Sequence, residues 1–206
     1  MTFPVVGSNI PGAYQISNSL RFNDDDGAKL SRTPSSATNR KTWTWSCWFK
    51  LANLGVRGTL FSVYGASNNN EFIEMRMNTS GTFAFSDYDT GIFTTTQVFR
   101  DVSSWYHMVI ALDTTQATES NRLKLYINGT QVTNFSSINY PTLNKDLGMN
   151  LDAPHNVGDL AFNGNFHFDG YIAEMHLVDG QAKSPTDFGE FDEDSGIWKP
   201  KQYAGT

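Results

Sequence analysis

The chain has 206 residues, of which 14% are aromatic and only 17% are charged, against about 25% charged residues in typical globular domains. Its net charge of −6 at pH 7 and the lack of a Lys/Arg cluster argue against nucleic-acid binding, and no run approaches the roughly 20 apolar residues that span a bilayer. The single cysteine, Cys47, excludes an internal disulfide, and the first residues, MTFPVVGSNIPG, show no secretory signal pattern.

The N-terminal quarter begins with a segment that has no core pattern. We therefore predict that residues 1–18 form an arm that docks onto a partner. Short strands are expected at 19–22 and 29–32, separated by an acidic loop. The run KTWTWSCWFKL, residues 41–51, alternates with period 2, so its Trp43, Trp45, Cys47 and Phe49 should share one face of a long strand.

The middle of the chain predicts a series of strands joined by polar turns. Strands are expected at 58–64 and 92–98, with a hairpin between 72–77 and 81–86. The stretch 105–135 predicts three more, because apolar residues alternate on both sides of a loop and Asn128-Gly129 then supplies the two positive-φ residues of a type I′ turn. A two-residue turn sets the register, so Leu125 should lie opposite Val132.

The last part of the chain is less regular. Residues 136–152 are expected to be irregular, 156–159 to enter a strand, and 166–178 to form a bulged strand or a strand pair. Ser184-Pro185 should start one short helical turn, with proline at its first position. With ten or more short strands and almost no helical periodicity, the chain is predicted to be all-β and antiparallel.

Three segments resemble the concanavalin A-like, laminin-G-like family. They are Trp105/His107, the hairpin Tyr126-Ile127-Asn128-Gly129, and the strand Asp169-Gly170-Tyr171-Ile172-Ala173-Glu174. The resemblance covers about residues 19–188 and implies one concanavalin A-like antiparallel β-sandwich (jelly roll). Residues 189–206 would then be a C-terminal extension or linker.

A second resemblance concerns the biological setting. The runs AYQISNSLRFNDDDGAKLSRT, NRKTWTWSCW and FDGYIAEMHLVDGQAKSPTDFGEFDEDSGIWKP are similar to laminin-G-like modules of structural proteins from tailed, notably marine, bacteriophages. This resemblance implies a virion protein that is made in the host cytoplasm, contacts other virion proteins as a homo-oligomer, and does not insert into a membrane.

An enzyme is not expected. Some glycosidases of this fold use carboxylates that alternate along one strand, and Glu190, Asp192 and Asp194 have that spacing. They lie among glycine and serine without flanking strand residues, which indicates a solvated acidic loop. Glu174 and His176 share a strand face but lack a second acid, and no Gly-x-Ser-x-Gly motif is present.

The expected ligands are sugars and, at most, calcium. No cofactor is required, but laminin-G-like domains often hold one Ca²⁺ at the sandwich rim, and hard oxygen ligands are offered by Asp87 and Asp89 and by Asp24 and Asp26. Sugar binding needs an exposed aromatic ring near polar side chains. Tyr88 between the aspartates Asp87 and Asp89, and a second group of Tyr140 with Asn144, match that composition, as does Tyr64 near residues 68–70.

The sequence thus predicts a non-enzymatic virion module: a tail fibre, head fibre or capsid decoration that presents a carbohydrate-binding sandwich to host-surface glycans. The alternative is a purely structural decoration or assembly protein without glycan binding. A polysaccharide-degrading enzyme is the more distant alternative.

Overall fold

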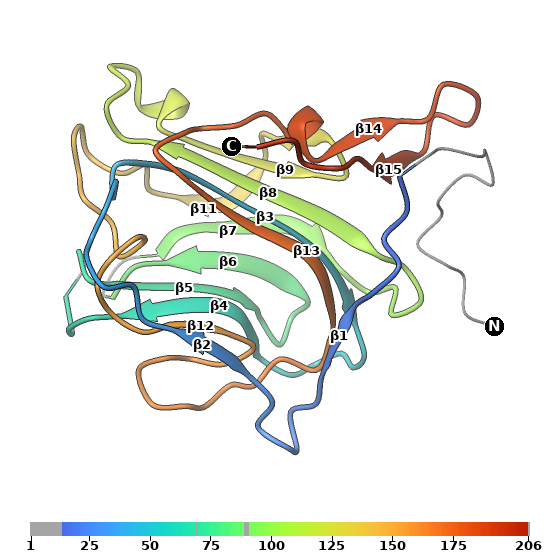
Figure 1. Ribbon diagram of the computed structural model, residues 1–206, viewed down its shortest axis with the longest axis horizontal. Helices are drawn as coiled ribbons and strands as arrows, with labels where there is room; N and C mark the ends of the chain where they lie inside the picture. Colours follow the sequence, from blue (N-terminus) through green and yellow to red (C-terminus); the bar gives the residue numbers. More distant parts are fainter. Residues whose placement is uncertain (1–13, 69, 89–90, 206) are drawn as a thin grey trace.

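The computed structural model describes residues 14–68, 70–88 and 91–205. Two antiparallel sheets pack face to face as a β-sandwich (Figure 1), which confirms the predicted fold class. Most of the predicted N-terminal arm, residues 1–13, lies outside the described residues, as does Asp89.

The first sheet has six strands in the order β1-β13-β3-β8-β9-β10. Its members are β1 (Leu20–Phe22), β13 (Gly170–Asp179), β3 (Thr42–Leu51), β8 (Tyr106–Asp113), β9 (Leu123–Ile127) and β10 (Thr130–Val132). The long strands β13, β3 and β8 form its centre.

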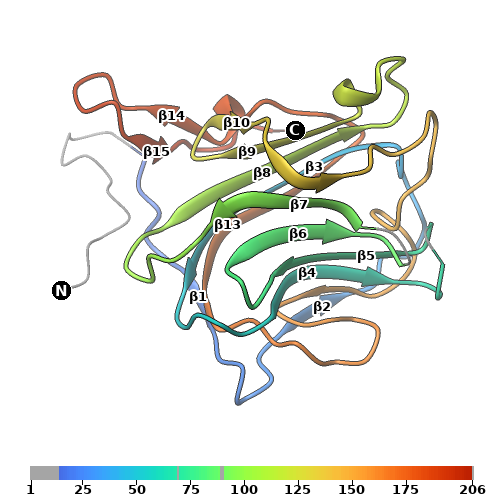
Figure 2. The same ribbon diagram turned by 180° about the vertical axis from the view of Figure 1, so that it is seen from behind.

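The second sheet has seven strands in the order β11-β7-β6-β5-β4-β12-β2, and Figure 2 shows β4 to β7 side by side. Its members are β11 (Phe135–Ile138), β7 (Gly91–Val98), β6 (Thr82–Ser86), β5 (Phe72–Met77), β4 (Gly58–Tyr64), β12 (His155–Val157) and β2 (Leu30–Arg32). Two 3₁₀ turns, η1 (Glu119–Asn121) and η2 (Pro185–Asp187), and a hairpin of β14 (Gly189–Phe191) and β15 (Trp198–Pro200) complete the fold.

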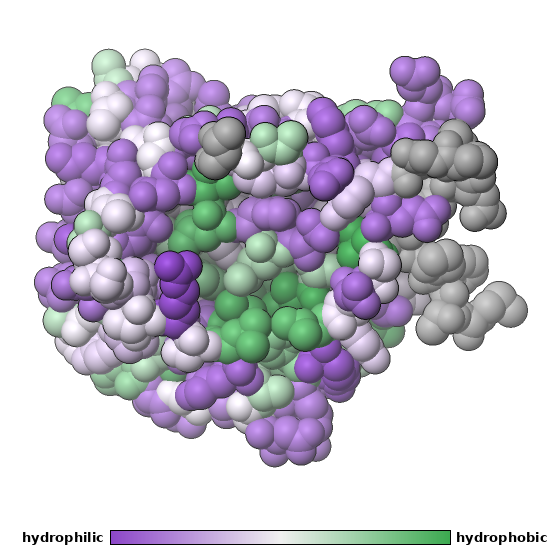
Figure 3. All heavy atoms as spheres, viewed as in Figure 1, coloured by the Kyte–Doolittle hydropathy of each residue, from purple (hydrophilic) through white to green (hydrophobic). Residues whose placement is uncertain are grey.

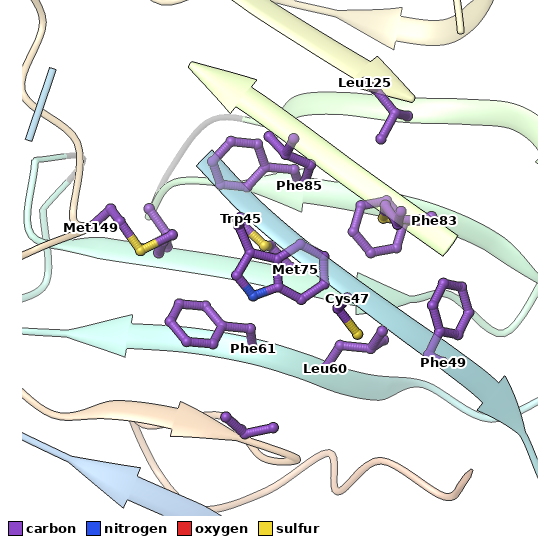
Figure 4. Packing of buried hydrophobic residues seen from close by; sticks show 14 of the residues in the cluster. Trp45, Cys47, Phe49, Leu60, Phe61, Met75, Phe83, Phe85, Leu125 and Met149 are labelled. Atoms are coloured by element: carbon purple, nitrogen blue, oxygen red, sulfur yellow. The ribbon is translucent and has the colours of Figure 1, made fainter. Parts of the chain in front are cut away.

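The core lies between the sheets and is filled by aromatic, aliphatic and sulfur-containing side chains (Figure 4). The predicted face of β3 is confirmed, since Trp43, Trp45, Cys47 and Phe49 are all fully buried there. Trp45 lies 6.2 Å from Phe61 of the opposite sheet, ring centre to ring centre. Such a core buries the large area that a chain with few charged residues needs for stability.

The predicted hairpin is also confirmed. Asn128 and Gly129 have φ angles of 47° and 78°, and Leu125 lies opposite Val132. Gly129 has a second role, because a Cβ atom there would lie 2.3 Å from the Trp198 ring. Position 129 must therefore lack a side chain so that the C-terminal hairpin can pack on the turn.

The sandwich is open along one edge. β1 pairs only with the first three residues of β13, and beyond a bulge after Ala173 the edge of β13 faces β2 across a cleft of about 610 Å³. Figure 3 shows hydrophobic atoms at the bottom of this hollow, and Met175 and Leu177 are among its lining residues.

Two segments contain strands that were not expected. Phe135–Ile138 form β11 on the edge of the second sheet, although the chain from residue 136 onward was expected to be irregular. Only four residues long, with two serines at its centre, this strand has too little alternation to be recognised. It forms because β7 offers a free edge for pairing.

The second unexpected element is the hairpin β14–β15, in the segment expected to be an extension without strong structure. Glu190, expected in a solvated loop, lies on β14, and its carboxylate is 3.4 Å from the Lys199 ammonium. Trp198 is 8% exposed and packs with Trp48 and Ala173. Residues 189–200 therefore cover part of the outer face of the six-stranded sheet.

Candidate functional site

The candidate site is the outer face of the seven-stranded sheet. Along β5 the side chains alternate: Ile73, Met75 and Met77 belong to the core, so Phe72, Glu74 and Arg76 point away from it. The loop that follows β12 lies over the same face, since the outward Ser62 hydroxyl donates to the Asp159 carbonyl and accepts from the Ala161 amide, both at 2.8 Å. Strand and loop together place charged and aromatic side chains next to each other.

At the centre of this face is a buried carboxylate, that of Glu74, which is 2% exposed. Arg57 Nη2 donates to both of its oxygens at 2.7 Å, Arg76 Nη1 donates at 3.0 Å, and the Thr59 hydroxyl donates at 2.8 Å. A buried carboxylate is tolerated only when it is paired and hydrogen-bonded in this way.

The two guanidinium groups outnumber the carboxylate, so this cluster carries a formal net charge of +1. Arg76 is further oriented by Asn78, which accepts from Nε at 3.1 Å, and by Ser86, which accepts from Nη1 at 2.7 Å. Arg57 lies under the Phe166 ring, with its Cζ atom 3.8 Å from the ring centre, a cation–π contact. Both arginine side chains keep part of their surface exposed, 32% for Arg57 and 23% for Arg76.

A groove of about 630 Å³ runs beside the cluster. Polar residues line it, and their hydroxyl, amide and guanidinium groups alternate with aliphatic carbon atoms: Arg57, Arg76, Asn78, Thr79, Ser80, Thr82, Thr94, Thr95, Thr96 and Ser136. The groove offers donors and acceptors in the density that a polyhydroxylated ligand needs.

Towards the rim, the same face carries a row of aromatic rings. Neighbouring ring centres are 4.9 Å apart for Phe162 and Tyr64, 6.4 Å for Tyr64 and Phe72, and 5.9 Å for Phe72 and Tyr88. The two ends of the row are open, since Tyr88 is 42% and Phe162 is 46% exposed. We call these four residues the aromatic row.

The predicted sugar-binding residues that the structure describes lie at this rim, in two adjoining segments. Lys145 Nζ is 2.7 Å from Asp87 Oδ2, which ties the loop after β6 to the chain around Asn144. Tyr88 belongs to the aromatic row, and Asn144 is exposed. Tyr140 is half-buried and packs against the core, so its ring has a packing role.

Three of the four aspartates predicted as calcium ligands, Asp24, Asp26 and Asp87, lie in the described part of the chain, in two different loops. Asp24 and Asp26 lie in the loop between β1 and β2, where Asp26 accepts from the Asn23 amide at 2.7 Å. Asp87 is 3% exposed and its carboxylate already holds the Lys145 ammonium. Among the residues that the structure describes, no three His, Cys, Asp or Glu side chains are grouped to hold a metal ion. Asp89 lies outside the described residues, so calcium binding by Asp87 and Asp89 stays a prediction.

One pair of side chains has the composition of a hydrolytic dyad. His107 Nε2 lies 2.9 Å from the Ser46 hydroxyl, and its Nδ1 lies 2.9 Å from the indole Nε1 of Trp198. An indole N–H only donates, so Nδ1 accepts and the ring proton is on Nε2. In this tautomer the imidazole donates to Ser46 and is no base for it. Burial lowers the pKa of His107 to about 3, so the ring stays neutral.

This histidine makes stability depend on pH. The pKa of His107 is about 3 in the folded chain and about 6.5 when unfolded, so its contribution is complete above pH 6.5 and is lost as the pH falls towards 3. Between pH 7 and pH 5 we expect the free energy of unfolding to drop by about 2 kcal/mol from this group. Urea unfolding at pH 7 and at pH 5 measures this difference in the free energy of unfolding. His107→Gln, which does not titrate, should show a correspondingly smaller drop; an equal drop in both proteins would contradict the assignment.

Cys47 is confirmed as a buried apolar residue. Burial raises the pKa of its thiol far above the usual range, so no thiolate is available as a nucleophile.

The arginine–glutamate cluster was not among the predicted site residues. A usable signal was present in FIEMRM, where Glu74 and Arg76 fall on the face opposite three apolar residues. Arg57, in contrast, precedes β4 in a loop with no period, and its partner is 17 residues away.

Comparison with known proteins supports the fold. The sequence model of the concanavalin A-like lectin/glucanases superfamily (Laminin_G_3) matches residues 22–187, and the curated proteins contain no match. Within the described ranges no helix has the length and apolar character to cross a membrane.

Among solved structures, the chain is similar to domains LG4-5 of the mouse laminin α1 chain (9% identity, TM-score 0.56, covering 98% of this chain and 48% of the other). It is similar to the carbohydrate-binding module CBM40 of a Ruminococcus gnavus sialidase (14% identity, TM-score 0.50, covering 78% of this chain and 96% of the other). It is also similar to the NanB sialidase of Streptococcus pneumoniae (14% identity, TM-score 0.51, covering 81% of this chain and 30% of the other). At these identities the likeness concerns the fold alone.

Proposed function

We propose that this chain, which belongs to the concanavalin A-like lectin/glucanases superfamily, is a non-enzymatic module that binds glycans on the outer face of its seven-stranded sheet. The observation that carries the proposal is the combination, on one face, of exposed rings and a groove lined by hydroxyl and amide groups. Sugar rings stack their apolar faces on aromatic side chains, and their hydroxyls bond to polar groups nearby.

A binding role suits this face better than a catalytic one. A retaining or inverting glycosidase needs two carboxyl groups flanking the scissile bond. Of the residues lining the groove none is acidic, and the neighbouring Glu74 is held by two arginines and is 2% exposed. The residues described on this face therefore support sugar binding better than acid–base hydrolysis.

The setting we propose is a phage particle, where the module would serve as a tail fibre, head fibre or capsid decoration for attachment to the host surface. The support is the sequence similarity of three runs to phage structural modules. Antibody labelling of assembled particles in the electron microscope tests this role, and labelling that is absent from every particle would refute it.

Tyr88→Ala is expected to weaken glycan binding about fivefold to tenfold, because a stacking contact of about 1 kcal/mol is lost. A glycan array with the intact protein first identifies ligands, and calorimetric titration then measures Kd for both proteins. Tyr171→Ala is the matched control, since Tyr171 is 37% exposed but lies on the six-stranded sheet. Equal loss in both variants, or none in Tyr88→Ala, would count against this face.

A further inference from the structure

Building on the proposed function, we propose that the glycan is acidic, and that Arg57 and Arg76 bind its carboxylate or sulfate groups in the groove. The chain as a whole has a net charge of −6, so a groove with a positive cluster stands out from the rest of the surface. At physiological salt, carboxylates more than about 8 Å from the groove are largely screened and repel an anionic ligand little. The charge of the cluster itself therefore determines the attraction.

The two guanidinium groups have donors to spare. Each carries five N–H groups. Arg57 reaches Glu74 through Nη2 alone, and its Nε is buried with no acceptor among the described residues. Arg76 uses Nη1 and Nε. Nη1 of Arg57 and Nη2 of Arg76 therefore have no acceptor in the described part of the chain, and each belongs to a side chain that lines the groove.

Glu74 acts as a positioning residue for these donors. Because its carboxylate is buried and bonded to both arginines, it fixes the two side chains before any ligand arrives. Binding then costs less side-chain entropy than it would with free arginines. Charge-assisted hydrogen bonds from guanidinium to carboxylate or sulfate are among the strong ones, and Asn78, Ser80 and Thr94 are placed to bond neutral hydroxyls of the same ligand.

Two matched pairs of oligosaccharides test the charge. The first is a galacturonic acid tetramer and its methyl ester, which lacks the charge. The second is a κ-carrageenan oligosaccharide and its unsulfated counterpart. We expect at least one acidic member to bind about tenfold more tightly than its neutral partner, and raising NaCl from 50 to 500 mM to reduce that advantage. Which pair responds identifies the anion.

The arginines are tested directly by Arg76→Gln and Arg57→Gln. Each should remove most of the preference for the acidic member, because the affinity for that member falls several times more than the affinity for the neutral one. Lys124→Gln on the six-stranded sheet, a residue that lines a different groove, should change neither. Arg76→Lys keeps the ion pair to Glu74 and serves if Arg76→Gln does not fold; it too should lose affinity, because lysine cannot supply the planar donor pair.

The outcomes separate this inference from the proposed function. If neutral and acidic members bind equally and the arginine variants change nothing, the acidic preference is wrong while glycan binding stands. If no sugar of either kind binds and the array is blank, both fail. Loss of acidic binding in Lys124→Gln as well would assign the effect to overall charge and overturn the role of the groove.

Discussion

Trp198→Ala is expected to lower the free energy of unfolding by about 3–5 kcal/mol, the range for removing a buried tryptophan. Trp198 is 8% exposed, and its ring stacks on the His107 ring at 5.9 Å, meets the Phe191 ring edge-on at 4.9 Å, and donates to His107 Nδ1. Truncation removes the packing of the C-terminal hairpin and leaves a buried nitrogen without its donor, which adds a desolvation penalty.

Urea unfolding at pH 7 measures this effect, and Ile197→Ala provides the control. Ile197 is the adjacent residue but is 56% exposed, so its truncation should change stability by no more than about 0.5 kcal/mol. A loss below about 1 kcal/mol for Trp198→Ala would mean that the hairpin contributes little to the sandwich, contrary to the packing seen around its ring.

The contrast between β3 and the C-terminal hairpin explains how far the sequence could predict the fold. β3 and the turn at Asn128-Gly129 follow from patterns within ten residues, so the buried face of β3 and the register of the hairpin could both be predicted. Trp198 has no such pattern around it. Its place depends on Gly129, Gly189 and Ala173, small residues that leave room for the ring. This complementarity is known only once the strands are assembled.

The site shows the same division. Tyr88 was selected because the local run Asp-Tyr-Asp has the composition of a sugar-binding loop, and the structure places it in the aromatic row. The same run suggested Asp87 as a ligand, but local composition could not reveal its ion pair with Lys145, which lies 58 residues further along the chain. The pairing of Arg57 with Glu74 likewise depends on a loop crossing the sheet, which period-2 alternation does not reveal.

Glu74→Gln is expected to lower the free energy of unfolding by about 2–4 kcal/mol. Removing one partner of a buried ion pair costs about 3–5 kcal/mol because the remaining charge is uncompensated. Here the arginines are a quarter to a third exposed, which reduces the cost. The neutral amide can accept a hydrogen bond, but it leaves two adjacent guanidinium groups with a charge of +2 between them.

Repulsion between the two guanidinium groups should also be measurable in a double variant. Removing one of the two charges, in Glu74→Gln/Arg57→Gln, should recover about 1 kcal/mol relative to Glu74→Gln, a coupling that a double-mutant cycle measures. Glu190→Gln, a half-exposed carboxylate beside Lys199, should cost at most about 0.5 kcal/mol. If the double variant is instead less stable than Glu74→Gln, packing and not charge balance holds this cluster. In that case the Glu74 carboxylate does not control the excess positive charge that favours an acidic ligand.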